Sequence, residues 1–194
     1  MVGFGEDLLE RMVRAVEKVR ERLRRSPAAL DAAGVPYAVI GGNAVAAWVS
    51  TVDPGAARNT VDVDLMINRS DFEAAKGALE GVGFVHDELM DAPMFLDGPN
   101  GSPRDAVHLL FAGEKVKATY AAAAPELSQA EDHEAYRLLQ LQSLVTMKLT
   151  SFRRKDQVHL LDMIGVGLLD ATWLDRLQPE LAERLQALLD APDG

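Results

Sequence analysis

The chain has 194 residues, contains no cysteine and carries a formal net charge of −10 at pH 7. Its length fits one domain, or a core with a helical appendage, and hydrophobic residues make up 48% of it, enough for such a core. The lack of cysteine excludes disulfides, thiolate zinc sites and a cysteine nucleophile. The acidic balance argues against a grip on nucleic acid by the whole surface, so a polyanionic substrate would have to be held locally.

The sequence carries neither a membrane span nor a secretory signal. No apolar run approaches the roughly 18 residues that a spanning helix needs. Residues 1–25 alternate charged with apolar residues, unlike the apolar centre of a signal peptide. We therefore expect a cytoplasmic protein without membrane contact.

The N-terminal region predicts two helices. Over residues 6–25 apolar side chains recur at helical spacing, which indicates an amphipathic helix. Ser26 and Pro27 are typical of the start of a second, short helix, and Gly34 is placed to end it. We interpret the basic cluster at the end of the first helix as a solvated face: Arg20, Arg22, Arg24 and Arg25.

The middle of the chain predicts alternating strands and helices. A short β-rich run over residues 35–40 stops at Gly41 and Gly42, and an alanine-rich helix over 43–49 follows. The later patterns predict, in chain order, a strand over 60–68, a helix over 71–80, a short strand over 84–88, a mobile loop over 91–103 and a strand over 106–112.

From residue 131 onward the patterns are helical, with helices expected over 136–152, 156–168 and 172–189. The predicted fold class is α+β, a short mixed β-sheet flanked by helices with a helical C-terminal part. We assign the α/β core with its N-terminal helix to residues 1–130 and the helical region packed on it to residues 131–194, as a single compact unit.

Asp62 and Asp64 stand two positions apart in the strand predicted over 60–68. Alternate strand residues share a face, so both carboxylates are expected to point the same way. Two neighbouring anions on an apolar strand repel each other and resist desolvation, and a divalent cation such as Mg²⁺ removes both problems. A solvent-facing strand with two harmless aspartates is the simpler alternative, because Asp-x-Asp is common.

Gly41 and Gly42 lie between the end of a strand and the start of a helix. Glycines there let the backbone approach a phosphate, and the helix N-terminus offers free N–H groups. A tight turn is the plainer explanation of the glycine pair alone. Phosphate donors near metal ligands suit phosphoryl chemistry, which depends on positioning and charge neutralisation.

The combination of motifs resembles the nucleotidyltransferase superfamily. The resemblance rests on "VIGGNAVAAWV" followed by "ARNTVDVDLMI", and the later "VTMKLTSFRRKDQVHLLDMI" is similar to the AbiEii-type, toxin-like branch related to minimal nucleotidyltransferases. It covers roughly residues 30–165. It implies a nucleotidyltransferase-like fold and transfer of a nucleoside monophosphate from a triphosphate to an acceptor hydroxyl, with release of pyrophosphate.

The resemblance also implies roles for individual residues. Asp62 and Asp64 would be catalytic and bind Mg²⁺, with Mn²⁺ as a second option. The positions expected to bind the nucleotide are Gly41, Gly42, Asn43, Arg58, Thr60, Lys148, Arg154 and Asp156. Lysines on helices usually reach solvent along their apolar stems, so an ordinary surface role is the alternative for Lys148.

One position departs from the family pattern. The family usually supplies a third carboxylate from a later strand, and His108 stands there in the run Val-His-Leu-Leu-Phe. Histidine can act as a base toward the acceptor hydroxyl, but its nitrogen suits manganese or zinc better than magnesium. We count His108 as catalytic. Three alternatives stay open: the histidine changes the metal used, it weakens or abolishes the activity, or it is a structural residue.

Two classes of function compete on this sequence. The first is an active enzyme whose acceptor is a tRNA, a protein or a small molecule, and whose toxin-like resemblance adds an antitoxin as a partner. The second is a degenerate, non-catalytic fold that binds a nucleotide or a protein, which the His108 substitution favours. A phosphohydrolase using the same metal site is a third, weaker hypothesis.

Overall fold

A single mixed sheet runs through the protein, whose computed structural model describes residues 4–87 and 93–191. Within those ranges the strand order is β3-β4-β5-β2-β1-β7-β6. The strands are β1 (Tyr37–Ile40), β2 (Val63–Ile67), β3 (Val85–Asp87), β4 (Met94–Leu96), β5 (Val107–Phe111), β6 (Ala130–His133) and β7 (Tyr136–Leu139). The helices are α1 (Phe4–Ala32), α2 (Gly41–Ser50), α3 (Phe72–Gly81), α4 (Leu141–Ser151), α5 (Arg154–Gly165) and α6 (Pro179–Asp190), with short 3₁₀ turns between elements. The predicted α+β class, a mixed sheet flanked by helices, is confirmed.

The central strands carry the core. Every residue of β1 is buried, as is every residue of β2 except the half-buried Asp64. Strand β2 pairs antiparallel with β1 and parallel with β5. Continuous apolar runs of this kind are typical of strands covered on both faces. The middle of the sheet is therefore a rigid support for any side chain projecting from β2 or β5.

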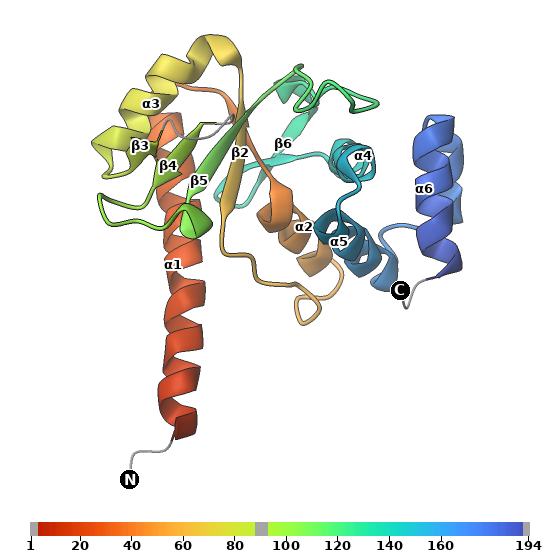
Figure 1. The fold of residues 1–194 in the computed structure, drawn as a ribbon, viewed down its shortest axis with the longest axis horizontal. Helices are drawn as coiled ribbons and strands as arrows, with labels where there is room; N and C mark the ends of the chain where they lie inside the picture. The colour runs from red at the N-terminus through yellow and green to blue at the C-terminus, as the bar shows by residue number, and fades with distance from the viewer. Residues whose placement is uncertain (1–3, 88–92, 192–194) are drawn as a thin grey trace.

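The helices form two groups around the sheet (Figure 1). Helix α1 contacts α3 and the strands β1, β2 and β7, whereas α2 contacts α4 and α5. Helix α6 lies outside the second group, against α4 and α5. In the described part of the chain, no helix combines the length and the apolar character needed to cross a membrane.

The prediction of two N-terminal helices is wrong, because α1 is continuous through Pro27. Ser26 does not cap a new helix; its hydroxyl donates to the carbonyl of Arg22 at 2.8 Å, within the same helix. A proline inside a helix forfeits one backbone hydrogen bond. Burial of Ala29 and Leu30 against the sheet offsets that loss, and Gly34, at φ +66°, follows the helix end as predicted.

The prediction of helix from residue 131 is wrong over residues 131–139 and is confirmed from residue 141, except that the helix expected over 172–189 is divided into a 3₁₀ helix, Ala171–Arg176, and α6. Residues 130–139 form the antiparallel pair β6–β7, and β7 joins the sheet beside β1. The helix expected over 136–152 is therefore only α4, from Leu141. The division of the chain at residue 130 stays a prediction.

The loop predicted over 91–103 contains strand β4, which pairs with both β3 and β5. Residues 91 and 92 lie outside the described part of the chain. Pro93 precedes the strand, and the glycine, asparagine and remaining proline residues of the segment fall after it, where the chain turns. The interpretation as one long loop is thus wrong over residues 94–96.

Two arginines of the cluster assigned to solvent are structural. Arg22 is buried and donates to the carbonyl of Val61 at 2.9 Å, and it forms an ion pair with Asp97. Arg25 also pairs with Asp97 and lies 4.3 Å above the ring of Phe84. A buried guanidinium needs partners for its fixed donors, and the folded chain brings them from distant segments.

Candidate functional site

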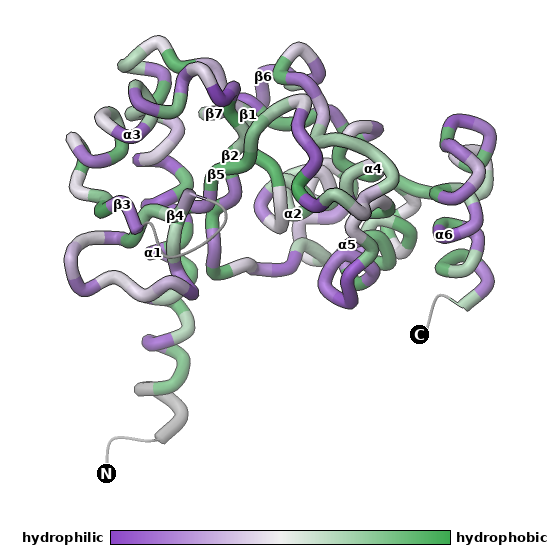
Figure 2. The backbone as a smooth tube through the Cα atoms, turned by 45° about the horizontal axis from the view of Figure 1, so that its top comes forward, coloured by the Kyte–Doolittle hydropathy of each residue, from purple (hydrophilic) through white to green (hydrophobic). Residues whose placement is uncertain are grey.

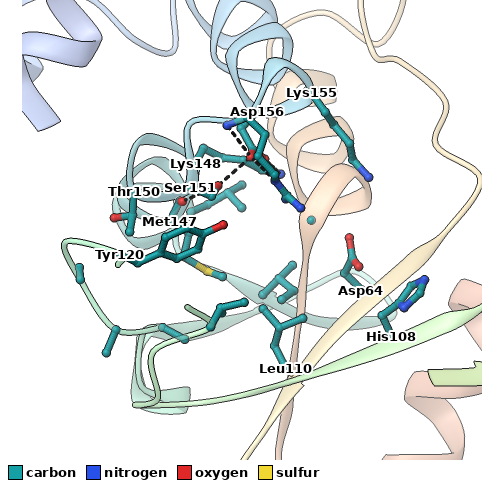
Figure 3. A pocket seen from close by; sticks show the side chains of 18 of the residues that line it. Asp64, His108, Leu110, Tyr120, Met147, Lys148, Thr150, Ser151, Lys155 and Asp156 are labelled. Atoms are coloured by element: carbon teal, nitrogen blue, oxygen red, sulfur yellow. Dashed lines mark hydrogen bonds and ion pairs between the residues drawn. The ribbon is translucent and has the colours of Figure 1, made fainter. Parts of the chain in front are cut away.

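A cavity of about 360 Å³ opens between the sheet and the helices α4 and α5 (Figure 3). This volume is within the range of small-molecule sites. On the sheet side it is lined by Gly41, Asp62, Asp64, His108 and Leu110, and on the helical side by Met147, Lys148, Ser151, Arg153, Lys155 and Asp156. Tyr120 comes from the loop after β5. We call these two sides the sheet wall and the helical wall.

The sheet wall presents the two aspartates. Asp64 lies within β2 and Asp62 immediately before it, and both line the cavity, as the alternation of strand residues predicts. Burial and the neighbouring charge of Asp62 raise the pKa of Asp64. Burial opposes ionisation of Asp62 too, but hydrogen bonds from Thr60 and Lys155 lower its pKa. The pair is thus an anionic site that only one cationic side chain, Lys155, contacts directly among the described residues.

Gly41 makes room for this pair. It adopts φ +69°, a left-handed conformation that L side chains rarely take, and a Cβ there would stand 1.9 Å from Asp64 Oδ2. A Cβ at Gly42 would stand 3.0 Å from the side chain of Thr60. The glycine pair therefore brings the first turn of α2 against the aspartates. This close packing alone explains why both positions are glycine, with no ligand needed.

His108 lies beside Asp64. Strand β5 runs parallel to β2, and the register sets His108 opposite Asp64. Both side chains line the cavity (Figure 3). The imidazole therefore lies next to the carboxylate pair, at the position where the resemblance implies a third carboxylate.

The helical wall is built around Asp156, which is fully buried. Its carboxylate accepts hydrogen bonds from Lys148 Nζ at 3.1 Å, Ser151 Oγ at 2.7 Å and Arg153 Nε at 2.8 Å. Although burial opposes it, these donors and the charge of Lys148 lower the pKa of Asp156 to about 2. Burial lowers the pKa of Lys148 despite its pairing with Asp156. Lys148 is thus a buried partner in a network, not a solvent-reaching lysine.

The predicted basic residue Arg154 is not part of this wall. Arg154 is exposed and contacts Gln157 at 3.5 Å, whereas its neighbours Arg153 and Lys155 line the cavity. Lys155 spans to the sheet wall, with Nζ 2.9 Å from Asp62 Oδ2. The phase of α5 decides which of the three cations faces inward. That phase follows from the left-handed turn at Phe152, φ 45°, which the sequence pattern does not predict.

The remaining predicted nucleotide contacts hold the segment before β2. Arg58 forms an ion pair with Asp162 of α5, with Nε 2.8 Å from Oδ2. Asn43 donates to the carbonyl of Asp62 at 2.8 Å, and Thr60 donates to the carboxylate of Asp62. Arg58, Asn43 and Thr60 thus position the aspartates. Arg58 and Thr60 line a neighbouring cavity of about 260 Å³ that shares Asp62 and Lys155 with the first.

A divalent cation fits the sheet wall. The carboxylates of Asp62 and Asp64 repel each other, and the pKa of Asp64 is raised. Mg²⁺ binds to carboxylates of this kind together with phosphate oxygens of a substrate. Among the described residues, no group of three or more acidic or histidine side chains is arranged to hold a metal by itself. Asp62 and Asp64 would therefore hold the ion jointly with a phosphorylated substrate.

Comparison with known proteins finds solved structures of similar fold, but no match to a protein family or to a curated protein. No protein-family model matches the chain. No curated protein matches it either.

Among solved structures, the solution structure of the antibiotic-resistance factor ANT(2'')-Ia matches with a TM-score of 0.52 and 16% identity, over 94% of this chain and 91% of that one. A crystal structure of ANT(2'')-Ia with adenylyl-2''-tobramycin matches with a TM-score of 0.48 and 15% identity, over 89% and 97%. A candidate nucleotidyltransferase from H. pylori matches with a TM-score of 0.46 and 14% identity, over 93% and 96%. The AbiEii-type branch stays a prediction, and the chain has the nucleotidyltransferase-like fold that its motifs implied.

Proposed function

We propose that this protein transfers a nucleoside monophosphate from a nucleoside triphosphate to an acceptor hydroxyl, in a reaction that depends on a divalent metal ion. The observation that carries the proposal is the opposition of charge across one cavity. Asp62 and Asp64 stand on one wall, and on the other wall the cations Lys148, Arg153 and Lys155 outnumber the single carboxylate of Asp156. A metal–triphosphate complex has the matching distribution, with a cation on one side and phosphate oxygens on the other.

Asp62 and Asp64 would hold the metal, which neutralises phosphate charge and orients the triphosphate. Lys155, already directed across the cavity toward Asp62, is suited to contact phosphate once a metal satisfies that carboxylate. Arg153 can offer further guanidinium donors, because part of its side chain is exposed to the cavity mouth. The triphosphate would thus lie between the walls, with its charge neutralised from both sides.

The transfer step needs a group to accept the proton of the attacking hydroxyl. His108 lies next to Asp64 in register and lines the cavity, so its imidazole is suited to that role. The acceptor oxygen would bond to the α-phosphorus, its proton would pass to His108, and pyrophosphate would leave. Apolar side chains such as Leu110, Tyr120 and Met147 line the rest of the cavity and suit a base or an acceptor ring.

The acceptor class and the cellular role are the finer parts of the proposal. A tRNA, a protein and a small molecule remain the three acceptors to test. The toxin-like role, an antitoxin partner and a cytoplasmic location follow from the AbiEii-type resemblance and the sequence alone.

Isothermal titration of the purified protein with each nucleoside triphosphate, with Mg²⁺ or Mn²⁺, tests the proposal. We expect metal-dependent binding that Asp62→Asn with Asp64→Asn abolishes. The matched control is Asp132→Asn, because that carboxylate is 97% exposed and far from the cavity lining. Turnover with labelled triphosphate then identifies the acceptor. No binding by the folded protein with either metal would overturn the proposal and favour a non-catalytic binding module.

A further inference from the structure

The loop that follows β5 supplies an aromatic side chain to the cavity. The two ends of residues 115–123 are held together, because Gly113 N donates to the carbonyl of Ala124 at 3.2 Å and Ala124 N donates to that of Glu114 at 2.8 Å. Loops closed at the neck in this way are compact surface elements that often carry function. Tyr120 of this loop is half-buried and lines the cavity, whereas residues 117–119 are exposed. We call residues 115–123 the cavity loop.

The neck of the cavity loop is fixed to the body. Glu114 forms an ion pair with Arg69, whose guanidinium lies 3.8 Å above the ring centre of Phe111 in β5. Within the loop, Tyr120 N donates to the carbonyl of Lys117 at 3.0 Å, in a turn. The fold of the neck and this turn therefore set where the ring of Tyr120 reaches the cavity.

Tyr120 belongs to an apolar end of the cavity. In Figure 3 its ring extends into the space between the helical wall and Leu110, on the side away from Asp64 and His108. Strand β5 and helix α4, which both carry hydrophobic positions (Figure 2), contribute Leu110 and Met147. We call this region the apolar end, and its side chains are Leu110, Val116, Tyr120, Ala122 and Met147.

The apolar end offers a surface for a flat ring and few groups to read the edge of that ring. Val116 lines it although this side chain is 50% exposed, so apolar surface is left open to a ligand. In the described part of the chain, the cavity lining contains no asparagine or glutamine, the side chains that pair with the edges of adenine. An aromatic face binds any base by stacking, because every base has a π face. The apolar end is thus suited to a nucleobase held by its face.

The other end of the cavity decides which reactant meets Tyr120. In the proposed transfer, the proton of the acceptor hydroxyl passes to His108, so the acceptor enters beside that imidazole, away from Tyr120 (Figure 3). The hydrogen bond from Arg153 to Asp156 raises the pKa of the guanidinium, and the nearby phenol of Tyr120 adds to this effect. Tyr120 is therefore close to a cation proposed to contact phosphate. The nucleoside of a triphosphate held by Arg153 would extend toward Tyr120.

We infer, on the basis of the proposed function, that the face of Tyr120 stacks on the nucleobase of the triphosphate and that the cavity loop is the base-binding element. Since stacking does not depend on the edge of the base, the protein should bind all four nucleoside triphosphates in the presence of a divalent metal ion. Purines present a larger face than pyrimidines, so ATP and GTP should bind more tightly than CTP and UTP. Tyr120 is then a binding residue that takes no part in the proton transfer.

Isothermal titration in the presence of Mg²⁺ or Mn²⁺ tests this role by comparing ATP with inorganic tripolyphosphate, which has the three phosphates and no base. We expect Tyr120→Ala to raise the Kd for ATP at least about fivefold and to leave the Kd for tripolyphosphate unchanged. Tyr120→Phe keeps the ring and should bind ATP as the unaltered protein does. Thr119→Ala is the matched control, because Thr119 is exposed and does not line the cavity. Circular dichroism verifies that the variants fold.

The outcomes separate the role of Tyr120 from the proposed function. If no nucleoside triphosphate binds to the folded, unaltered protein, both are overturned. If ATP binds and Tyr120→Ala leaves its Kd unchanged, or raises the Kd for tripolyphosphate equally, the function stands and the stacking role is overturned. A loss in Tyr120→Phe as large as in Tyr120→Ala would assign the contact to the hydroxyl and would also overturn stacking. Binding confined to one of the four triphosphates would show that a base edge is read, with the same consequence.

Discussion

The two walls of the cavity carry opposite charge and differ in how well that charge is satisfied. On the helical wall, Asp156 accepts hydrogen bonds from Lys148, Ser151 and Arg153, and its pKa falls to about 2. On the sheet wall, Asp64 is held beside a second carboxylate, and its pKa is raised. Removing one partner of a buried and fully paired charge is strongly destabilising, whereas two carboxylates that repel each other gain from a bound cation.

The difference between the walls divides the predicted site residues into two groups, one that stabilises the fold and one that is suited to bind a ligand. Lys148 and Asp156 satisfy each other, so their main effect is to fix α4 against α5. Asp62 and Asp64 gain most from an added cation. The comparison can be tested by variants that act on one wall at a time.

The largest effect is expected from Asp156→Ala. Removing this carboxylate leaves the buried ammonium of Lys148 without its direct counter-charge, which should lower the free energy of unfolding by about 3–5 kcal/mol. Urea unfolding followed by circular dichroism measures the change. Asp132→Ala, at an exposed aspartate, is the control and should change stability by about 0.5 kcal/mol or less. Equal effects of the two variants would contradict the assigned difference.

A smaller loss, about 2 kcal/mol, is expected from Gly41→Ala, because the site combines a positive φ with a close approach to Asp64. The alanine would push the Asp64 carboxylate away from the cavity and weaken metal-dependent nucleotide binding as well. Gly77→Ala in α3 is the control: no atom lies within 4 Å of its added Cβ, and a helical alanine should stabilise by up to about 1 kcal/mol. If Gly41→Ala behaved like Gly77→Ala, the argument for a crowded aspartate pair would fail.

The burial of His159, with two lysines of the helical wall nearby, should appear in a pH profile of stability. Burial, with the charges of Lys148 and Lys155, lowers the pKa of His159 from 6.5 to about 4. Between these two pH values the unfolded chain binds the extra proton, so the free energy of unfolding falls as the pH drops. We expect this histidine to contribute on the order of 2 kcal/mol of that fall.

His159→Gln should remove that part of the slope. The measurement compares urea unfolding of the two proteins from pH 7 to pH 4, using the change with pH and not the absolute stability. His133→Gln is the control, because His133 lies in β6 and lines neither wall of the cavity. Parallel profiles of His159→Gln and the unaltered protein would show that the wall does not suppress this charge.

The smallest stability effect is expected from Asp64→Asn. The amide removes the like-charge conflict with Asp62, so the free energy of unfolding should stay unchanged or rise by up to about 1 kcal/mol. Metal-dependent binding of nucleoside triphosphate should nevertheless be lost. A loss of stability as large as that of Asp156→Ala would make Asp64 a structural residue and remove the contrast between the walls.

Local chemistry sufficed to predict the sheet wall. The alternation of strand residues places Asp62 and Asp64 on one side, and the glycine pair after β1 marks the strand-to-helix turn beside them. His108 was found through the family resemblance, as the residue that stands where a third carboxylate is expected. The first two inferences each span only a few residues, over which backbone geometry fixes where a side chain points.

The helical wall could be predicted only in part. Lys148, Arg154 and Asp156 were all chosen through the motif, but which of Arg153, Arg154 and Lys155 faces the cavity depends on where α5 begins. A shift of one residue turns a helix by about 100°, and that start is set by the left-handed turn at Phe152. The partners of Arg22, which are Val61 and Asp97, are likewise invisible in a local pattern.

The sequence by itself determined the strand, glycine-pair and helix order, the position of the aspartates and the apolar repeat of α1. Only the tertiary structure decided that residues 130–139 pair as strands beside β1 and that α1 runs through Pro27. The physical reason is that local propensities differ by about 1 kcal/mol or less for most residues, and by about 3 kcal/mol for a proline inside a helix. Burial against the sheet and hydrogen bonds to distant segments outweigh such differences, and those contacts exist only once the chain has folded.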